Sequence, residues 1–405
     1  MGALGMRLPA LLSPLLPATS CLPLVPHYPT SALEQSAQVK EFAVNEVAPG
    51  AKERDLNEDF LATRDILKKM GKLGLMGIPY AKEYGGAGLG YVEYALAGFE
   101  LNKVDASVGI SYSVHISLGS GPIYNFGNEE QKQKYMPKLC SGEYIAAFGL
   151  TEPCAGSDAG ASQCTAVLQG DKYILNGTKC FTTNGEFADV IVVFAMTDPS
   201  QGTKGISAFI VEPKNFPGIK FVKREKKMGI RASVQNVIEM ENLEVPKENL
   251  LGKEGQGFKI AMATLDCGRI GVAAHATGIA KGAYEYALNY SKERVQFGKP
   301  IAKQQVIAFK LADMYAKIEA AEAVTLKAAW SKDQHLPYGV PAAVAKLTGT
   351  NTAMEVTTEA VQILGGTGFT MDHPVERMMR DSKITQIYEG TNEIQKLVIS
   401  GAILR

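Results

Sequence analysis

Apolar residues in the first third of the chain recur at the three-and-four spacing of an amphipathic helix. Two groups carry this pattern: Val39, Phe42, Ala43 and Val47, and then Phe60, Ile66, Leu67, Met70 and Leu73. The helical pattern runs from Ser31 to about Gly142. It predicts an N-terminal α-helical domain over residues 31–144.

Short β-rich runs replace the helical pattern in the middle of the chain. Residues 189–195 (DVIVVFA) and 205–211 (GISAFIV) are rich in Val, Ile and Phe and are bounded by turn residues. Several strands at regular spacing with no helix between them favour a compact antiparallel barrel or sandwich. We therefore expect a middle domain over residues 145–257, built as an antiparallel β-barrel.

A hairpin is expected within this region. The turn residues 169–172 (QGDK) join the apolar run 166–168 to the run 173–175. Asn176-Gly177 follows, and this dipeptide is typical of a two-residue hairpin turn. The sequence thus predicts one hairpin at residues 169–172 and another turn at Asn176-Gly177.

Helical periodicity returns at about Phe258 and continues to the end of the chain. Three stretches are long enough for an antiparallel bundle: residues 270–295, 301–333 and 341–364. We therefore expect a C-terminal helical bundle over residues 258–405. The order of helices, strands and helices is not the alternation of a doubly wound nucleotide fold.

A glycine-rich segment, residues 85–90 (GGAGLG), superficially suggests a phosphate-binding loop. No strand precedes it, and the GxGxxG spacing is absent, so the segment lacks the context of a dinucleotide fold. A loop between two helices is the better prediction.

The composition indicates a globular protein without a nucleic-acid surface. The 405 residues include 42 basic and 42 acidic side chains, whereas a nucleic-acid surface would show a large basic excess. Hydrophobic residues make up 46% and charged residues 21%, as in ordinary globular proteins. The sequence has no run of about 20 apolar residues, so we expect no membrane-spanning helix.

The 6 cysteines form no CxxC pair and do not combine with histidines at zinc-ligand spacing. We therefore expect neither a disulfide framework nor a metal site, and a reducing compartment fits best. His115 and His275 lie in apolar or Ala-rich helical stretches, where packed histidines are expected rather than proton carriers.

The first thirty residues differ from the rest. Residues 1–30 contain six prolines, a single Arg (Arg7) and no acidic residue. Three interpretations stay open: a disordered tail or mis-assigned start, an organelle transit peptide, or a secretory signal around Leu11–Leu16 that prolines interrupt. A transit peptide would direct the protein to the mitochondrial matrix; otherwise a bacterial cytoplasm is expected.

Three loops carry residue types that binding sites use. Residues 148–158 (FGLTEPCAGSD) combine hydroxyls, glycines and an acid, and residues 179–185 (KCFTTNG) pair an aromatic ring with hydroxyls. Residues 387–395 (IYEGTNEIQ) place Glu389 before a glycine, where a carboxylate could act as a general base. Each loop also has a plain structural interpretation: a polar turn, a strand with its turn, and acids that complement a helix dipole.

These loops, taken in order with two further motifs, resemble the acyl-CoA dehydrogenase family. The motifs are TEPCAGSD (151–158), RVQFGKP (294–300), QILGG (362–366) and YEGT (388–391). The resemblance covers the chain from about residue 33 to Arg405. Two further segments, TLDCGRIG (264–271) and MGIR (228–231), look like the short-chain, butyryl-CoA type. The family fold is α+β, with an N-terminal helical domain, a middle β domain and a C-terminal four-helix bundle.

The resemblance implies FAD-dependent α,β-dehydrogenation of a short-chain acyl-CoA, such as butyryl-CoA, to trans-2-enoyl-CoA, or the reverse reduction of crotonyl-CoA. Glu389 matches the base that removes the proton alpha to the thioester, while a hydride leaves the beta carbon for flavin N5. The Glu389 N–H and a ribityl hydroxyl would hold the thioester oxygen. A homotetramer that exchanges electrons with electron-transferring flavoprotein is implied.

The resemblance also assigns binding residues. Family contacts to FAD match Phe148, Leu150, Thr151, Ser157, Phe181, Thr183, Arg294, Phe297, Gln362, Gly366, Thr391 and Glu393. Contacts to the substrate match Ser157, Asp266, Arg269, Tyr388 and Gly390. Arg294, Phe297, Gln362 and Gly366 would reach the FAD of a neighbouring subunit. The family more often carries Trp at the position of Phe181.

The roles of Asp266 and Arg269, the substrate class and the overall function each have alternatives. Asp266 and Arg269 are three residues apart on an expected helix, so they could form an ion pair instead of facing the acyl-CoA entrance. Gly268 stands where some branched-chain members carry their base, which disfavours isovaleryl-type specificity. Rival functions are an acyl-CoA oxidase that uses O₂, a branched short-chain acyl-CoA dehydrogenase, and a catalytically silent binding subunit.

Overall fold

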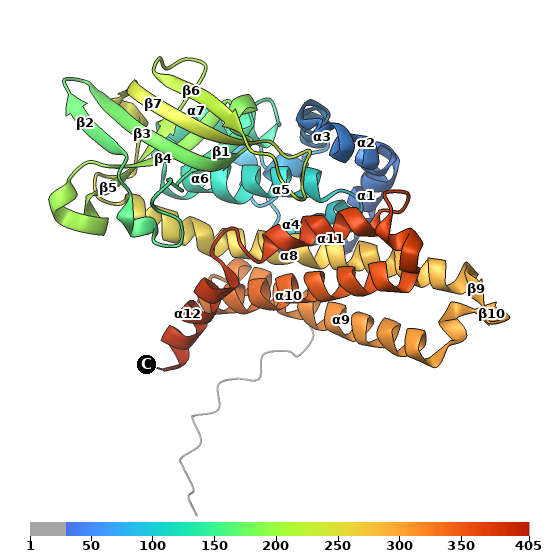
Figure 1. Ribbon diagram of the computed structural model, residues 1–405. Coiled ribbons are helices and arrows are strands. Elements are labelled where there is room, and N and C mark those ends of the chain that lie inside the picture. The colour runs from blue at the N-terminus through green and yellow to red at the C-terminus, as the bar shows by residue number, and fades with distance from the viewer. Residues whose placement is uncertain (1–29, 405) are drawn as a thin grey trace, which may run out of the picture.

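The computed structural model describes residues 30–404, and its elements follow the order that the sequence predicts (Figure 1). Helices come first, a β-sheet follows, and long helices complete the chain. Apart from Thr30, the segment interpreted as a leader lies outside the described residues.

Between Thr30 and the sheet there are seven α-helices: α1 (Thr30–Phe42), α2 (Ala51–Asn57), α3 (Phe60–Lys72), α4 (Tyr91–Asn102), α5 (Ala106–Ser113), α6 (Gly121–Phe126) and α7 (Glu129–Cys140). Asp105 shows how local chemistry starts one of them. Its carboxylate accepts the Ser107 N–H at 2.9 Å at the N-terminus of α5 and the Arg54 Nε–H at 2.9 Å. The glycine segment 85–90 is a loop before α4, as expected.

Short helical segments connect or extend the main elements. Two are π-helical, η1 (Ala43–Val47) and η5 (Val114–Ser120). The others are 3-10 turns: η2 (Ala48–Gly50), η3 (Leu75–Gly77), η4 (Lys82–Tyr84), η6 (Ala159–Ala161), η7 (Gly185–Phe187), η8 (Pro199–Gly205), η9 (Lys247–Asn249), η10 (Ile301–Lys303) and η11 (Gly365–Phe369).

The middle region is one eight-stranded sheet in the order β6-β7-β3-β2-β4-β5-β8, with β1 paired to β4. Its strands are β1 (Ala146–Gly149), β2 (Thr165–Gln169), β3 (Lys172–Thr183), β4 (Val190–Met196), β5 (Ile206–Val211), β6 (Ile219–Arg224), β7 (Gln235–Pro246) and β8 (Leu250–Leu251). Most neighbours are antiparallel, as expected, but β1–β4 and β2–β4 are parallel. Within residues 30–404 no pairing joins β6 to β8, so these two strands are the edges of the sheet.

The hairpin at residues 169–172 is confirmed, because Leu168 pairs with Tyr173 across β2 and β3. The turn expected at Asn176-Gly177 is wrong. There β3 continues to Thr183 and only bulges, with a register shift between Leu175 and Gly177 and a Gly177 φ of 135°. A glycine that suits a turn also suits a bulge, and here it lets β3 pass Cys164, whose Sγ would lie 2.5 Å from a Cβ at position 177.

The C-terminal region contains α8 (Gly257–Glu293), α9 (Gln305–Asp333), α10 (Gly339–Leu364), α11 (Val375–Thr385) and α12 (Asn392–Ile403). The first four pack as the expected bundle, and α12 lies on α10. A two-stranded hairpin, β9 (Val295–Gln296) and β10 (Lys299–Pro300), joins α8 to α9. Figure 1 shows this hairpin at the opposite end of the bundle from α12.

The three regions share one hydrophobic core. A single cluster contains Tyr94 of α4, Val192 of β4 and Ile270 of α8. Because helices of both flanking regions pack with the sheet, the domain boundaries at 144/145 and 257/258 remain predictions.

Residues 30–404 contain no disulfide, no candidate metal cluster and no helix that could span a membrane. Cys140, Cys154, Cys164, Cys180 and Cys267 are all free. No group of His, Cys, Asp and Glu in this range could hold a metal ion. Among the described helices, none is long and apolar enough to cross a membrane.

Candidate active site

Glu389 occupies a tight turn between α11 and α12. Its backbone is left-handed, with a φ of 53°, and Gly390 follows with a φ of 89°. Both carboxylate oxygens are buried and have no hydrogen-bond partner among the described residues. A buried polar group without a partner is costly, so such groups commonly mark a functional position.

The carboxylate lies against α8 at Gly268. A Cβ at position 268 would come within 2.0 Å of Glu389 Oε2 and 3.0 Å of Leu118 Cδ2. Any side chain at Gly268 would therefore displace the carboxylate. The two positions that the sequence analysis contrasted as alternative sources of the base thus share the same space.

The environment of Glu389 favours a proton-accepting carboxylate near neutral pH. Burial raises its pKa from 4.5 to about 7, although the positive charges of Lys346 and Arg269 act in the opposite direction. A carboxyl with this pKa can be ionised at neutral pH and still be a much better base than an exposed glutamate.

Lys346, which the sequence analysis did not single out, is a fully buried cation close to Glu389. Its ammonium donates to Asn392 Oδ1 at 3.0 Å, and Thr350 Oγ1 donates to the same oxygen at 3.0 Å. Burial lowers the pKa of Lys346 to about 7, against the influence of Glu389, which raises it. The only signal in the sequence is one lysine within the Ala-rich stretch of α10.

Tyr388 links the turn to α8. Its hydroxyl lies 3.2 Å from His275 Nδ1. Burial lowers the pKa of His275 to about 3, so this histidine is neutral at physiological pH. Burial likewise lowers the pKa of His115 to about 4, and its ring contacts the Leu139 carbonyl at 3.1 Å. Both histidines are packed, as expected.

A second part of the site is the loop that follows β1, and it is anchored by a buried ion pair. The fully buried Lys179 ammonium lies 2.6 Å from Glu152 Oε1 and 3.1 Å from the Leu150 carbonyl. Glu152 also accepts the Gln163 N–H at 2.6 Å and the Ser162 hydroxyl at 2.5 Å. Burial would raise the pKa of Glu152, but Lys179 and these hydrogen bonds outweigh it and hold the pKa at about 2.

This anchor brings two predicted FAD-contact segments together. The Cys180 N–H donates to the Thr151 carbonyl at 2.8 Å, which places Leu150 and Thr151 beside Phe181. The Phe181 side chain is 59% exposed and its φ is 55°. Thr183 Oγ1 accepts from Gln235 Nε2 at 3.2 Å, so the hydroxyl proton of Thr183 is free to donate.

Phe148 connects this loop to the Glu389 turn. Its ring centroid lies 5.0 Å from that of Phe194 of β4, with the two rings tilted by 60°. Phe148 and Tyr388 both pack against the buried cluster that contains Leu118. Phe148 thus packs with the residue before Glu389, while the Cys180–Thr151 hydrogen bond holds Leu150 and Thr151 beside Phe181.

Four other predicted residues lie close to Glu389. Arg269 forms the expected i,i+3 ion pair with Asp266, at 2.5 Å, and its charge also acts on Glu389. Thr391 begins α12, where its Oγ1 accepts the Ile394 N–H at 3.3 Å. Glu393 is exposed in the first turn, and hydrogen bonds from its own N–H and from Thr391 lower its pKa.

The remaining predicted contacts are elsewhere. Ser157 is exposed on its loop. Arg294 follows the last residue of α8, and Phe297 lies in the turn between β9 and β10, where it is 95% exposed. Gln362 and Gly366 lie at the end of α10, near the same end of α8, because Thr367 Oγ1 is 3.3 Å from the Tyr290 hydroxyl. One chain thus carries its predicted FAD contacts in two separate places.

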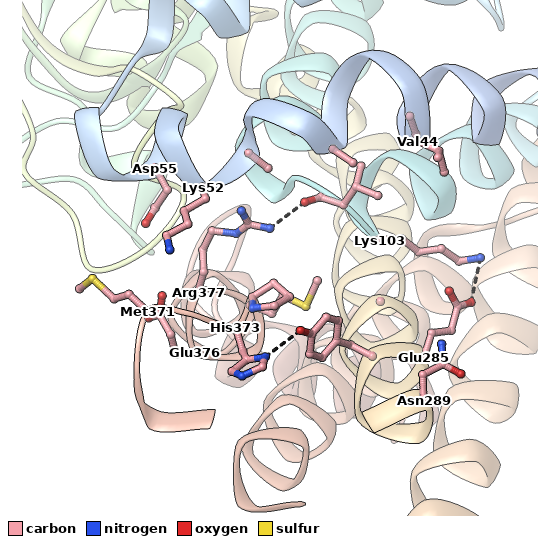
Figure 2. A pocket seen from close by; sticks show the side chains of 18 of the residues that line it. Val44, Lys52, Asp55, Lys103, Glu285, Asn289, Met371, His373, Glu376 and Arg377 are labelled. Atoms are coloured by element: carbon pink, nitrogen blue, oxygen red, sulfur yellow. Dashed lines mark hydrogen bonds and ion pairs between the residues drawn. The ribbon is translucent and has the colours of Figure 1, made fainter. Parts of the chain in front are cut away.

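None of the predicted site residues lines the cavity shown in Figure 2. This cavity of about 510 Å³ lies between α1, α2, α8 and the segment that leads into α11. Its walls are joined by polar contacts: Tyr286 to His373 Nδ1 at 2.7 Å, and Lys103 to Glu285 at 3.2 Å. It is separate from the Glu389 turn.

Models of one family match the chain over most of its length. They are the acyl-CoA dehydrogenase N-terminal domain (residues 31–143), middle domain (147–243) and C-terminal domain (255–404). The chain belongs to the acyl-CoA dehydrogenase family. It is therefore an oxidoreductase of the kind that dehydrogenates acyl-CoA thioesters.

Two curated relatives of this acyl-CoA dehydrogenase are short-chain specific. The chain is 56% identical over 367 residues to the short-chain specific acyl-CoA dehydrogenase of Clostridium acetobutylicum, covering 91% of this chain and 96% of that protein. It is 48% identical over 366 residues to the mitochondrial short-chain specific acyl-CoA dehydrogenase of Homo sapiens, covering 90% and 88%. Relatives thus occur in bacteria and in mitochondria.

Solved structures agree with the family assignment. Butyryl-CoA dehydrogenase from Megasphaera elsdenii matches with a TM-score of 0.91 and 48% identity, covering 93% of this chain and 99% of that chain. A chain from the structure of the electron transferring flavoprotein of Acidaminococcus fermentans matches with a TM-score of 0.92 and 54% identity, covering 93% and 99%. An acyl-CoA dehydrogenase complexed with FAD from Bacillus anthracis matches with a TM-score of 0.88 and 38% identity, covering 94% and 68%.

Proposed function

We propose that this acyl-CoA dehydrogenase oxidises short-chain acyl-CoA thioesters, with butyryl-CoA as the typical substrate, and that Glu389 is its catalytic base. The observation that carries the proposal is the Glu389 carboxylate, which is buried without a partner, has a pKa of about 7 and lies against a glycine. The short-chain specific relatives support the substrate class.

The reaction begins when Glu389 removes a proton from the carbon alpha to the thioester carbonyl. Negative charge then develops on the thioester oxygen, and the Glu389 N–H would stabilise it as a hydrogen-bond donor. No backbone carbonyl of residues 30–404 accepts from this N–H, so it is available. Arg269 and Lys346 keep enough positive charge nearby for Glu389 to be ionised before substrate binds.

FAD is the cofactor, and it supplies the acceptor for the hydride that leaves the beta carbon. The residues fit a flavin. The exposed ring of Phe181 offers a flat apolar surface, and Thr183 has a free hydroxyl proton. Phe148, Leu150, Thr151, Ser157, Thr391 and Glu393 would complete the contacts from the same chain.

The other four predicted FAD contacts support an oligomer. Arg294, Phe297, Gln362 and Gly366 lie at the far end of the bundle, so they would contact the FAD of a neighbouring subunit in a homotetramer. Asp266, Arg269, Tyr388, Gly390 and Ser157 would contact acyl-CoA. We infer that electron-transferring flavoprotein is the redox partner, which the Acidaminococcus structure supports. The enzyme would work in a bacterial cytoplasm or a mitochondrial matrix, because its relatives include bacterial and mitochondrial proteins.

Replacing Glu389 by Gln tests the base directly. Glu389→Gln keeps the size of the side chain but cannot accept the proton, so kcat should fall by roughly 10²- to 10⁴-fold while FAD is retained. Turnover with butyryl-CoA and an artificial acceptor would be compared with that of Glu319→Gln, an exposed control on α9. Near-normal turnover by Glu389→Gln would show that another group is the base.

A substrate series tests the chain-length class. Anaerobic flavin bleaching should be faster with butyryl-CoA than with octanoyl-CoA or isobutyryl-CoA. Faster bleaching by octanoyl-CoA would contradict the short-chain assignment. Rapid O₂ consumption without an acceptor protein would identify an acyl-CoA oxidase instead.

A further inference from the structure

Tyr94 is a buried side chain of α4 that the proposed chemistry does not use. It is 1% exposed, and its hydroxyl shares a 2.7 Å hydrogen bond with Ser113 Oγ. The pKa of Tyr94 is raised chiefly by burial, and the charge of Glu389 contributes. The hydroxyl of Tyr94 is therefore close enough to the proposed base for their charges to interact.

Two glycines of α8 relate Tyr94 to Glu389. Gly268 and Gly271 are three residues apart and lie on the same face of the helix. A Cβ at Gly268 would lie 2.0 Å from Glu389 Oε2, whereas one at Gly271 would lie 2.4 Å from the Tyr94 hydroxyl and 2.5 Å from Ser113 Oγ. Three residues advance a helix by about 4.5 Å. The Tyr94 hydroxyl thus lies against α8 about one helical turn away from the Glu389 carboxylate.

The two directions along α8 from Glu389 differ in their access to solvent. Asp266, just before Gly268, has a side chain that is 35% exposed. Beyond Gly268, Ile270 and Ala274 are 0% and 1% exposed. The CoA portion of a substrate is large and carries phosphates, so it has to remain at the open end. The acyl chain consequently extends from Glu389 toward Tyr94.

We propose that Tyr94, held in place by Ser113, is the floor of the acyl pocket and limits the substrate to short chains. The proposal rests on the proposed function, because it takes Glu389 as the base at the alpha carbon. With C–C bonds of about 1.5 Å, a butyryl chain reaches roughly 2.5 Å beyond the alpha carbon and an octanoyl chain roughly 7.5 Å. Only the former fits into the helical turn between Gly268 and Gly271.

The hydrogen bond between Tyr94 and Ser113 suits this role. Each hydroxyl has a partner, so no unpaired polar group faces the terminal methyl of the substrate. The same bond fixes the ring in one position, and Gly271 leaves the space that the phenol occupies. The floor is therefore rigid rather than adaptable.

Replacing Tyr94 with a smaller side chain tests the floor in the FAD-loaded enzyme. In Tyr94→Leu, the ratio of kcat/KM for octanoyl-CoA to that for butyryl-CoA should rise at least about 10-fold, since each methylene that finds room adds binding. A second readout needs no turnover: the ratio of Kd values for crotonyl-CoA and trans-2-octenoyl-CoA, measured by calorimetry, should shift in the same direction.

Phe99→Leu is the matched control, because Phe99 is equally buried on α4 but packs beside Gly278 rather than Gly271. It should leave both ratios unchanged. If Tyr94→Leu does not fold, Tyr94→Met is used instead, because the flexible Met side chain can move aside for a longer acyl chain. Wild-type ratios in a folded variant at position 94 would overturn the proposal. An enzyme that turns over no acyl-CoA would contradict the proposed function, while the two Kd values would still decide on the floor.

Discussion

Glu152 and Glu389 are two glutamates with buried carboxylates, and their surroundings are opposite. Glu152 lies against Lys179 and accepts from Ser162 and the Gln163 N–H, so its pKa is held at about 2. Glu389 has no hydrogen-bond partner among residues 30–404, and its pKa is about 7. One carboxylate is permanently ionised and fixes a loop, whereas the other stays able to exchange a proton.

A buried lysine lies near each glutamate, but only one of the two lysines bonds directly to its glutamate. Lys179 contacts Glu152 directly, at 2.6 Å. Lys346 instead donates to Asn392 and influences Glu389 only through its charge. A direct ion pair lowers the pKa of a carboxyl so far that it is no longer a useful base. A positive charge farther away lowers the pKa less, and the carboxylate can still accept a proton.

Lys179→Met should have the largest effect on stability. It leaves the Glu152 carboxylate buried without its counter-ion, which typically costs about 3–5 kcal/mol. Denaturant unfolding and FAD content should both drop, because the loop that positions Thr151 beside Phe181 loses its anchor. The double variant Lys179→Met/Glu152→Leu, which removes both charges, should recover much of the loss. No recovery would mean that the pair does not act through its charges.

Glu389→Gln should change stability in the opposite direction. Below pH 4.5 the carboxyl is protonated in both states; between pH 4.5 and about 7 only the unfolded chain ionises, so the folded state loses stability as pH rises. The rise in the Glu389 pKa from 4.5 to about 7 corresponds to a loss of roughly 3 kcal/mol in the free energy of unfolding above pH 7. Thermal melts should therefore show Glu389→Gln to be more stable than wild type at pH 8 and similar at pH 4.5. A less stable variant at pH 8 would refute the unpartnered state of this carboxylate.

Lys346→Met should produce the smallest change, a shift in the pH dependence of catalysis. Wild-type kcat/KM should rise with pH through about 7, as Glu389 ionises. Without the charge of Lys346, Arg269 remains as the nearby cation, and the midpoint should move upward by about one unit. Lys346→Arg, which keeps a charge, should leave the midpoint near that of wild type. A merely structural role for Lys346 would lower stability in Lys346→Met without moving the midpoint.

Local chemistry made much of the fold predictable from the sequence. Helical periodicity and short β-rich runs predicted the order of the regions, and the turn residues 169–172 predicted the β2–β3 hairpin correctly. The i,i+3 spacing of Asp266 and Arg269 was sufficient to propose their ion pair. The Asn176-Gly177 turn failed because whether a glycine ends a strand or bulges it depends on the partner strand, β7, more than 50 residues away.

Contacts between distant segments could not be predicted in this way. Nothing in the spacing along the chain places Lys346 near Glu389, or Tyr94 against Gly271, because each pair meets only when α4, α8, α10 and the 389 turn pack together. The YEGT motif directed attention to Glu389 through resemblance, but burial and the missing partners became visible only in three dimensions. The assigned roles of the remaining site residues stay predictions.

The left-handed backbone at Glu389 has a consequence for protein engineering. At a φ of 53° the backbone conformation costs less free energy for a glycine or an asparagine than for a glutamate. Neither of these residues would bury a charge there. A redesign or selection scheme that scores thermostability alone would therefore discard this residue early and return a robust but inert flavoprotein. Position 389 should therefore be held constant in any such library. Stabilising substitutions should be placed instead at exposed positions away from the turn.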